Sequence, residues 1–298
     1  MTQMTSSARG TIFLERARVI SQVAHDAQQF VLRVAAPRCA AHAQPGSFAH
    51  ITCDAAIPMR RPLSIMRAGA RGGWIEMRYK ALGPGLHALA GRKVGEEVSV
   101  LGPIGRPFAP HPERPRTLLL GGGVGIPPMV FLAERTAAAG GTARKPLVLM
   151  GSEVPFPFRT RPSRLIVPGI PAGAIACMPL LEEWGVPCRL ASRADLPGCF
   201  PGFVTELADA WLASLSAAEL GEVEIFSCGP TPMLEASAKL ARRYGVPCQV
   251  ALEEFMACAV GGCAGCTVLV QTPAGPAMKR VCVDGPVFDA YAVFGAAR

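Results

Sequence analysis

Four cysteines near the carboxyl end limit most strongly what this chain can fold into. Cys258, Cys263 and Cys266 follow one another with the spacing C-x4-C-x2-C, and Cys282 follows 16 residues later. This is the plant-type spacing of a [2Fe–2S] cluster, in which four soft, anionic thiolates hold two tetrahedral irons. The glycines among these cysteines suit a loop whose backbone wraps closely around a cluster.

A structural zinc site and a set of buried, unliganded thiols are the alternatives. Zinc sites prefer two C-x2-C pairs, and only Cys263 and Cys266 have that spacing. The sequence therefore favours an iron–sulfur cluster, with Cys258, Cys263, Cys266 and Cys282 as its ligands.

The chain has 11 cysteines in all, and the other seven are dispersed. Reducing compartments keep thiols free, and a free cysteine usually behaves as a small buried hydrophobic residue. Residues 1–10 are polar, and no run of about 18 apolar residues occurs, so we expect neither a secretory signal nor membrane insertion. These observations predict a cytoplasmic protein.

Composition indicates a globular protein of two or three domains. Of the 298 residues, half are hydrophobic and 17% are charged, which allows a large core. The net charge of +8 comes from scattered residues without a basic run. Nucleic acid is therefore an improbable partner, and nucleotide phosphates together with a solvated surface explain the charge better.

The first part of the chain, residues 1–112, has the pattern of a small antiparallel β-barrel. Short segments with apolar–polar alternation are separated by turns, which is typical of barrels. The expected strands are Thr11–Val19, Gln29–Val34, Phe48–Cys53, Pro62–Met66, Trp74–Lys80 and Glu97–Leu101. The proline-rich stretch Pro110–Pro115 predicts a linker, because it can form neither a helix nor a complete strand ladder.

Residues 113–247 alternate between apolar strands and amphipathic helices, and this alternation predicts an α/β domain with an open parallel sheet. The segment Pro155–Pro187 within it is rich in proline and gives no clear assignment. Residues 248–298 then form a small Cys-rich domain. The expected fold is therefore multidomain: a barrel, an α/β domain and a [2Fe–2S] domain.

A glycine-rich turn marks the start of the α/β domain. Gly121, Gly122, Gly123 and Gly125 lie between a buried strand and a helix, where backbone N–H groups can approach a pyrophosphate. Such turns also occur for packing alone. A second turn, Cys228-Gly229-Pro230, follows another strand at the same expected edge of the sheet, and this favours a dinucleotide site.

Two basic motifs lie in the barrel region. In Arg60-Arg61-Pro62-Leu63-Ser64, a guanidinium can hold a phosphate and the serine hydroxyl can bond a flavin ring, although a charged strand edge would look similar. The stretch from Arg78 to Gly85 runs from a basic strand into a glycine-rich turn. It could cradle a pyrophosphate or form a simple hairpin turn.

The order of these motifs resembles the ferredoxin–NADP reductase superfamily: R-P-x-S in a barrel, then a glycine-rich turn, then C-G-P. The cysteine segment and the later Cys282-Val-Asp-Gly-Pro-Val-Phe288 narrow the resemblance. The chain is similar to the electron-transfer subunits of heterodimeric, NAD-linked dihydroorotate dehydrogenases, from about Thr11 to Phe288.

This resemblance implies FAD, a [2Fe–2S] cluster and NAD as cofactors. It implies an FMN-containing catalytic dehydrogenase subunit as the partner, in a heterodimer or heterotetramer. The residues that it places along FAD are Arg61, Pro62, Leu63, Ser64, Arg78, Tyr79, Lys80, Gly85 and Leu86. Those that it places beside the nicotinamide nucleotide are Gly121, Gly122, Gly123, Gly125, Cys228, Gly229 and Pro230.

The chain departs from the family pattern at three places. Leu86 stands where a threonine is usual, so one phosphate hydrogen bond is in doubt. Pro155–Pro187 is longer than the usual loop. Leu190-Ala-Ser-Arg-Ala194 replaces an acidic turn, and its Ser-Arg pair makes NADP a possible nucleotide.

The implied cofactors predict a transfer role. Nicotinamide moves two electrons as hydride and a cluster takes one at a time, so a flavin must lie between them. We expect no acid–base dyad, and we interpret Glu253-Glu254 as a solvated turn. The other candidates are a subunit of a hydrogenase or ferredoxin–NADP oxidoreductase complex, a stand-alone oxygenase reductase, and a non-enzymatic zinc module.

Overall fold

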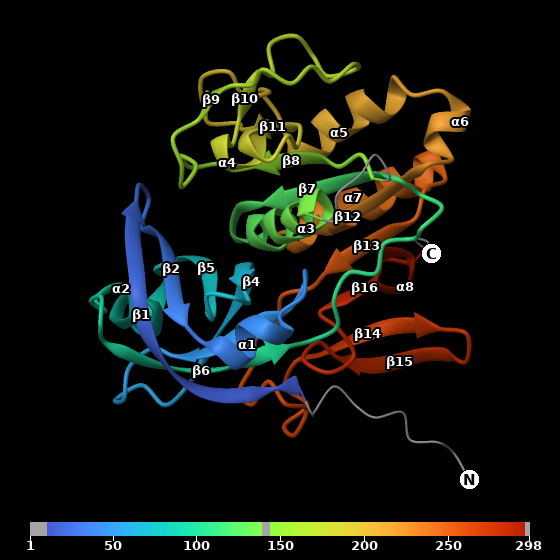
Figure 1. The fold of residues 1–298 in the computed structure, drawn as a ribbon. Helices are drawn as coiled ribbons and strands as arrows, with labels where there is room; N and C mark the ends of the chain where they lie inside the picture. Colours follow the sequence, from blue (N-terminus) through green and yellow to red (C-terminus); the bar gives the residue numbers. More distant parts are fainter. Residues whose placement is uncertain (1–10, 139–143, 296–298) are drawn as a thin grey trace.

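The computed structural model describes residues 11–138 and 144–295. Figure 1 shows a barrel, an α/β layer that lies beside it, and a two-stranded hairpin near the carboxyl end of the chain. The N-terminal residues 1–10, from which we predicted the lack of a secretory signal, lie outside the described residues. Among the helices of the described ranges, none combines the length and the hydropathy that crossing a bilayer requires.

Six antiparallel strands close into the barrel in the order β1-β2-β5-β4-β3-β6. Their bounds are β1 Phe13–His25, β2 Gln29–Ala35, β3 Phe48–Thr52, β4 Arg61–Gly69, β5 Trp74–Lys80 and β6 Glu97–Ile104. Two short helices, α1 (Pro37–His42) and α2 (Gly83–Ala90), join them. Alternate side chains such as Leu32, Ile51, Ile65 and Met77 fill the interior, because successive side chains of a strand point to opposite faces. The predicted barrel is confirmed.

The α/β layer contains a six-stranded sheet in the order β11-β8-β7-β12-β13-β16. All neighbouring pairs are parallel except the last, β13 with β16. The strands are β7 Arg116–Gly122, β8 Leu147–Gly151, β11 Cys188–Ala191, β12 Val223–Cys228, β13 Cys248–Ala251 and β16 Val287–Asp289. Buried leucine, valine and phenylalanine run through β7, β8 and β12, as expected for a sheet covered on both faces.

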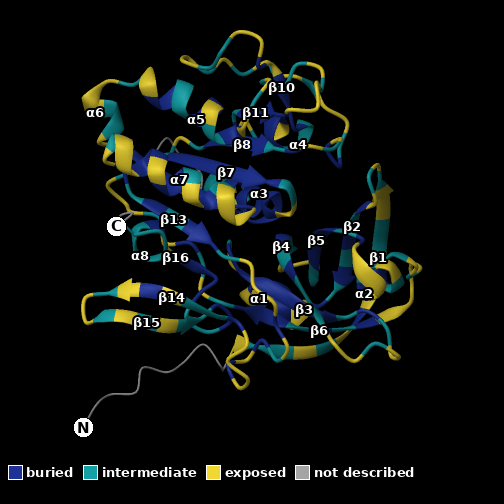
Figure 2. Ribbon diagram, turned by 180° about the vertical axis from the view of Figure 1, so that it is seen from behind, coloured by how far each residue is buried: buried dark blue, intermediate teal, exposed yellow. Residues whose placement is uncertain are grey.

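Helices cover both faces of this sheet, as Figure 2 shows by the dark strands between partly exposed helices. The longer helices are α3 Ile126–Ala138, α5 Val204–Ala213 and α7 Thr231–Tyr244. The shorter ones are α4 Pro179–Glu183, α6 Ala217–Leu220 and α8 Ala290–Val293, and the 3-10 turn η2 spans Gly123–Gly125. The predicted α/β fold is confirmed, with one antiparallel strand added to its sheet.

The carboxyl-terminal region does not stand apart from the sheet. Strands β13 and β16 both lie within residues 248–298, and both pair in the six-stranded sheet. Between them come the cysteine loop and the hairpin of β14 (Thr267–Thr272) and β15 (Gly275–Arg280). The domain bounds at 112 and 247 stay predictions, and the cysteine segment is an excursion between two strands of the sheet.

The segment Pro155–Pro187, which the sequence left unassigned, packs against the barrel and the sheet. It contains the two-residue strands β9 (Arg161–Pro162) and β10 (Ala176–Cys177), followed by α4. Phe156 and Leu181 join the core beneath β8 and β11. The amide nitrogen of Gln29 donates to the carbonyl of Pro155 at 2.7 Å, which ties this segment to the barrel.

A buried carboxylate fixes the linker between the barrel and the sheet. Glu224 of β12 is fully buried and accepts hydrogen bonds from the backbone N–H of His111, at 2.9 Å, and from Gln249 Nε2, at 2.8 Å. His111 Nδ1 lies 2.9 Å from the same carboxylate. Gln249 also bonds both backbone groups of Ala109. The linker is thus held by side chains of two sheet strands.

We expect Glu224→Ala to lower the free energy of unfolding by about 2–4 kcal/mol, because it removes the shared acceptor of His111 and Gln249 and leaves a cavity at a fully buried position. The matched control is Glu222→Ala, which removes a half-exposed partner of Arg116 and should cost less than about 1 kcal/mol. Urea unfolding of both variants measures the difference. Equal costs would show that the buried carboxylate does not hold the linker.

Candidate functional site

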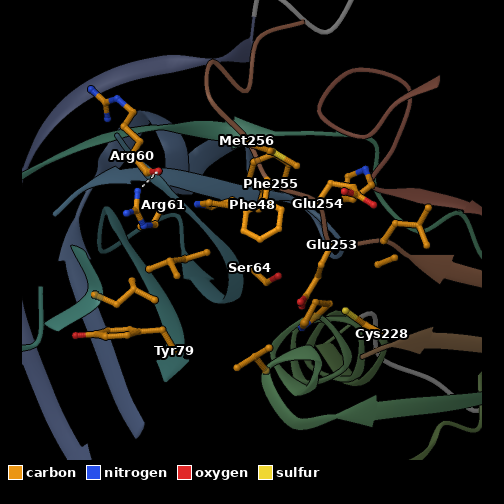
Figure 3. Close-up of a pocket in the computed structure, with 18 of the residues that line it drawn as sticks. Phe48, Arg60, Arg61, Ser64, Tyr79, Cys228, Glu253, Glu254, Phe255 and Met256 are labelled. Atoms are coloured by element: carbon orange, nitrogen blue, oxygen red, sulfur yellow. Dashed lines mark hydrogen bonds between the residues drawn. The ribbon is translucent and has the colours of Figure 1, made fainter. Parts of the chain in front are cut away.

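A cleft of about 850 Å³ lies between the barrel and the sheet, a volume typical of cofactor sites. Strands β4 and β5 form one wall, the end of β12 and the start of α3 form another, and the chain after β13 closes it (Figure 3). Of the residues predicted to bind cofactors, those that line the cleft are Arg61, Pro62, Leu63, Ser64, Arg78, Tyr79, Lys80, Leu86 and Cys228.

Two adjacent arginines at the start of β4 point in different directions. Arg60 binds strands β3 and β6, donating from Nη1 to the carbonyls of His50 and Ser99, both at 3.0 Å, and from Nη2 to the Ser99 hydroxyl. Arg61 Nη1 bonds the backbone carbonyls of Met59 and Arg60. A Cβ added at Gly85 would lie 3.2 Å from the Arg61 guanidinium, so this group reaches the first turn of α2.

Arg61 and the start of α2 therefore share a position suited to a phosphate. The first backbone N–H groups of a helix lack helical partners, and no side chain caps α2. A guanidinium beside such N–H groups supplies both charge and further donors. Gly85 does not itself line the cleft, but its missing side chain lets Arg61 approach.

Tyr79 is held by two contacts. Its hydroxyl donates to Gln22 Oε1 at 2.9 Å, and its ring stacks on Phe30 with centroids 5.4 Å apart. Burial raises the pKa of Tyr79, so the phenol stays protonated at neutral pH. The side chain offers a fixed, partly apolar surface to the cleft.

Arg78 has a different environment from the one that the resemblance implied. Its guanidinium donates to the carbonyl of Gly123 and to the side chain of Gln29, so it joins the barrel to the glycine-rich turn. Burial lowers the pKa of Arg78 to about 10, which keeps it charged at neutral pH. Arg78 lines the cleft, but its guanidinium is already engaged with protein groups.

The two glycine turns pack against each other at the carboxyl ends of β7 and β12. A Cβ at Gly125 would lie 2.3 Å from the Cys228 carbonyl oxygen, and one at Gly229 would lie 2.8 Å from the Met233 sulfur. Only glycine permits this approach. Gly121, Gly122, Gly123, Gly125, Gly229 and Pro230 lie at this edge without lining the cleft. Their neighbours Val124 and Cys228 do line it.

The chain that follows β13 supplies lining residues that sequence reasoning missed. Glu253, Glu254, Phe255 and Met256 all line the cleft, whereas the sequence suggested a solvated turn at Glu253-Glu254. Protein atoms crowd Glu253 although solvent reaches it through the mouth of the cleft, and burial raises its pKa. Burial, and then the nearby charge of Glu253, raise the pKa of Cys228.

The available signal for Glu253 was its place just after a strand. The carboxyl ends of parallel strands in an open sheet are where ligands bind. The sequence places residues 248–298 in a separate cysteine domain, and it therefore does not predict that 248–251 pairs with β12. Further lining residues without a motif are Gly46, Phe48, Met59, Arg60, Leu82, Pro128, Ala251, Leu252, Ala257, Gly265 and Pro286.

The four cysteines of the carboxyl-terminal segment lie in two pairs. Cys266 Sγ and Cys282 Sγ are 3.4 Å apart, and both residues are buried. Cys263 N–H donates to Cys258 Sγ at 3.4 Å, and these two residues are more exposed. Within residues 11–138 and 144–295, no three His, Cys, Asp or Glu side chains converge on one point.

Backbone groups of the loop point at the sulfurs. Partial burial opposes ionisation of Cys258, but N–H groups including those of Val260 and Cys263 lower its pKa to about 6. Burial and the neighbouring Cys266 raise the pKa of Cys282 to about 12, while the Gly261 backbone acts in the opposite direction. N–H groups aimed at sulfur stabilise anionic ligands, so this donor set fits an iron–sulfur cluster.

The loop carries non-glycine residues in the left-handed region. Ala259 has φ +56° and Ala264 has φ +54°. This conformation costs an alanine roughly 1–2 kcal/mol. The strain lies next to two of the cysteines, where the rest of the segment must hold the loop in place.

We expect Ala259→Gly to leave the loop intact and to stabilise the protein by up to about 1 kcal/mol. Gly261→Ala is the matched opposite change: Gly261 has φ +82°, and an added Cβ would lie 2.6 Å from Val283 Cγ2. It should lower both stability and iron content. Thermal unfolding and iron analysis measure both effects, and a destabilising Ala259→Gly would contradict the assignment of strain.

Comparison with known proteins agrees with this geometry. The family model described as the iron-sulfur cluster binding domain of dihydroorotate dehydrogenase B matches residues 253–294, which include all four cysteines. A solved structure of an NADH-dependent reduced ferredoxin-NADP oxidoreductase superposes with a TM-score of 0.73 at 24% identity, covering 94% of this chain and 90% of that one. A ferredoxin reductase of carbazole 1,9a-dioxygenase gives 0.60 at 23% identity, covering 79% and 67%.

These structures share the fold of this chain, and the matched cysteine segment adds an iron–sulfur cluster binding domain to it. Dihydroorotate dehydrogenase B (NAD(+)) electron transfer subunits are similar over most of their length. The protein from Shouchella clausii is 33% identical over 275 residues, covering 90% of this chain and 92% of that protein. The one from Caldanaerobacter subterraneus is 32% identical over 250 residues, covering 84% and 86%.

The chain belongs to this family of electron transfer subunits of NAD-dependent dihydroorotate dehydrogenase B. The resemblance and the fold inferred from the sequence are confirmed.

Proposed function

We propose that this subunit carries electrons between a catalytic dihydroorotate dehydrogenase subunit and NAD, through FAD in the cleft and a [2Fe–2S] cluster on the four cysteines. The observation that carries the proposal is the shared wall of the two sites. Glu253 to Ala257 line the cleft, and Cys258, the first cysteine of the cluster segment, follows directly. A flavin in the cleft would therefore lie next to the cysteine loop.

The cleft offers a place for each part of FAD. Arg61 and the N-terminal turn of α2 would hold the pyrophosphate, and Ser64 with the backbone of β4 would face the ring system. Tyr79, fixed by Gln22 and Phe30, would pack along the flavin without needing to reorient. Leu86 supplies no hydroxyl, so the phosphate contacts fall to Arg61 and backbone N–H groups.

Nicotinamide would enter at the edge where Val124 and Cys228 line the cleft. Bound FAD exchanges two electrons as hydride with nicotinamide and single electrons with an iron–sulfur cluster. The glycine turns allow close approach of a pyrophosphate, and the packed side chains position the two rings rather than donate protons. Glu253 contributes polarity beside Cys228 at the point where the rings would meet.

The pairing of the cysteines supports a two-iron cluster. Cys258 with Cys263 and Cys266 with Cys282 would supply two thiolates each, the four ligands that such a cluster requires. All eleven cysteines lie in the described part of the chain and none forms a disulfide there. A reducing compartment, which we propose to be the cytoplasm, suits such thiolate ligands.

We expect protein purified anaerobically to contain one FAD, two irons and two sulfides per chain, with little zinc. Arg61→Ala should weaken FAD binding roughly tenfold or more, because a charge-assisted phosphate contact is lost. Fluorescence titration of apoprotein with FAD measures this. The control Arg60→Ala removes a guanidinium that binds the barrel backbone and should act mainly on stability. A colourless, zinc-containing protein would refute the proposed function.

The nucleotide we propose is NAD, with NADP as the alternative. Ser192 and Arg193 follow β11 at the carboxyl edge of the sheet, where the adenosine end of a dinucleotide can lie. The Arg193 guanidinium lies over the Phe203 ring, with Cζ 4.9 Å from the ring centroid. Arg193 Nη1 lies 3.8 Å from Glu153 Oε1. A carboxylate beside the arginine disfavours a 2′-phosphate by like-charge repulsion.

We expect wild-type protein to be reduced faster by NADH than by NADPH, and Glu153→Gln to raise the relative rate with NADPH several-fold. Stopped-flow reduction of the flavin with each nucleotide measures this. Glu183→Gln, on the short helix α4, serves as a charge-matched control. Faster wild-type reduction by NADPH would establish NADP instead.

The partner we propose is an FMN-containing catalytic dehydrogenase subunit, in a heterodimer or heterotetramer. Electrons must leave near the cysteine loop, and Phe255 beside it is 93% exposed, as is typical of an aromatic interface anchor. Cys263 and Val260 are also exposed on this loop.

We expect Phe255→Asp to weaken association with the catalytic subunit at least tenfold, compared on samples of matched flavin and iron content because Phe255 also lines the cleft. Ile166→Asp is the control, because Ile166 is 89% exposed but lies between β9 and β10. Figure 1 shows these strands on the other side of the α/β layer from β14 and β15. Co-expression and affinity measurement compare the two. Equal binding by both variants and wild type would exclude this face.

A further inference from the structure

Gly261 connects the two halves of the cysteine centre through its backbone. It lies in the loop between Cys258 and Cys263, and its carbonyl accepts a hydrogen bond of 2.9 Å from Arg280 Nη1. The loop of the first three cysteines is thus bonded to a residue two positions before Cys282.

Arg280 is itself held by the turn that carries Cys282. Its backbone N–H donates to Asp284 Oδ2 at 2.8 Å, and its carbonyl accepts from the N–H groups of Val283 and Asp284 at 3.0 and 2.7 Å. Its side chain is 36% exposed, and Nε lies 3.9 Å from Asp284 Oδ2. The guanidinium is therefore fixed between the fourth cysteine's turn and the loop of the other three.

The loop at Gly261 packs closely against Val283 and Arg280. Gly261 has φ +82°, and a Cβ there would lie 2.6 Å from Val283 Cγ2 and 3.4 Å from Arg280 Nη1. The Gly261 position is therefore set by close contact on one side and by the Arg280 hydrogen bond on the other. Removing that bond would free the loop between Cys258 and Cys263 on the side that faces Arg280.

We propose that Arg280 is a positioning residue that raises the reduction potential of the cluster. The inference rests on the proposed [2Fe–2S] function. Reduction adds negative charge to the cluster sulfurs, and N–H···S bonds and a nearby cation stabilise that charge. Arg280 supplies the cation directly, and by holding Gly261 it keeps in place the loop in which the Cys263 N–H donates to Cys258 Sγ. It touches neither substrate nor flavin.

The neighbouring Lys279 provides a matched control. Lys279 pairs with Val268 and Arg280 with Thr267 across the β14–β15 hairpin, so their side chains leave the strand on opposite faces. Lys279→Gln removes the same charge one residue away, and no hydrogen bond joins Lys279 to the loop among the described residues. Any general effect of charge on the hairpin would appear in both variants.

The test is an EPR-monitored redox titration of the holoprotein for wild type, Arg280→Gln, Arg280→Lys and Lys279→Gln, with iron measured on each sample. We expect Arg280→Gln to lower the equilibrium constant for one-electron reduction about tenfold, which equals about 59 mV. Arg280→Lys keeps the charge but loses the planar fork, so it should shift the potential part of the way. Lys279→Gln should shift it less than half as much as Arg280→Gln.

An unchanged potential in Arg280→Gln with full iron content would overturn the proposal, and so would equal shifts in Arg280→Gln and Lys279→Gln. If Arg280→Gln loses its iron, Arg280→Lys decides: a wild-type potential in that variant overturns the proposal, and a lowered one supports it. The wild-type sample separates this from the proposed function, because a wild type without the [2Fe–2S] EPR signal contradicts that function first.

Discussion

The seven residues from Leu252 to Cys258 have to satisfy two sites at once, and the arrangement of the molecule follows from that requirement. On one side this segment leaves β13 at the carboxyl edge of the sheet and lines the cleft. On the other it enters the cysteine loop. The Leu252 N–H donates to the Pro286 carbonyl at 2.9 Å, which ties the segment to the turn after Cys282. A shift of this segment would therefore change both the cleft and the cysteine loop.

The barrel is joined to the same region. The Arg106 N–H donates to the Gly285 carbonyl at 2.6 Å, and Phe48 of β3 packs with Met256, Cys266 and Cys282. At the opposite side of the cleft, Arg78 bridges β5 and the Gly123 carbonyl. Contacts at both ends thus fix the width of the cleft, and a cofactor bound there would need little rearrangement of the protein.

The barrel strands, the glycine turn and the cysteine ligand set can be predicted from the sequence, because each depends on a local pattern. The spacing of Cys258, Cys263, Cys266 and Cys282 encodes a ligand set directly, and the glycine turn encodes close backbone packing that the contact of Gly125 with Cys228 explains. Barrel strands such as β5 follow from alternation. The cofactor roles of Arg61, Ser64 and the glycines remain predictions that the geometry supports.

What the sequence could not supply depends on long-range pairing. Strand β13 has four residues, and nothing local shows that it pairs with β12 or that β16 returns to it. The sequence therefore does not show that the exposed segment at Glu253 lies at the ligand-binding edge of the sheet. Nor does it show that Arg78 bonds Gln29 and Gly123, which lie 49 and 45 residues away.

The most direct test of the shared wall is the anaerobic reduction of the cluster by NADH, followed by EPR and visible absorbance in two forms of the protein. One form carries cluster and FAD, and the other keeps the cluster after FAD is removed. The account predicts rapid reduction of the cluster only in the first form, and its recovery when FAD is added back. Equal reduction of both forms, or a cluster that stays oxidised beside fully reduced flavin, would contradict a route from the cleft to the cysteine loop.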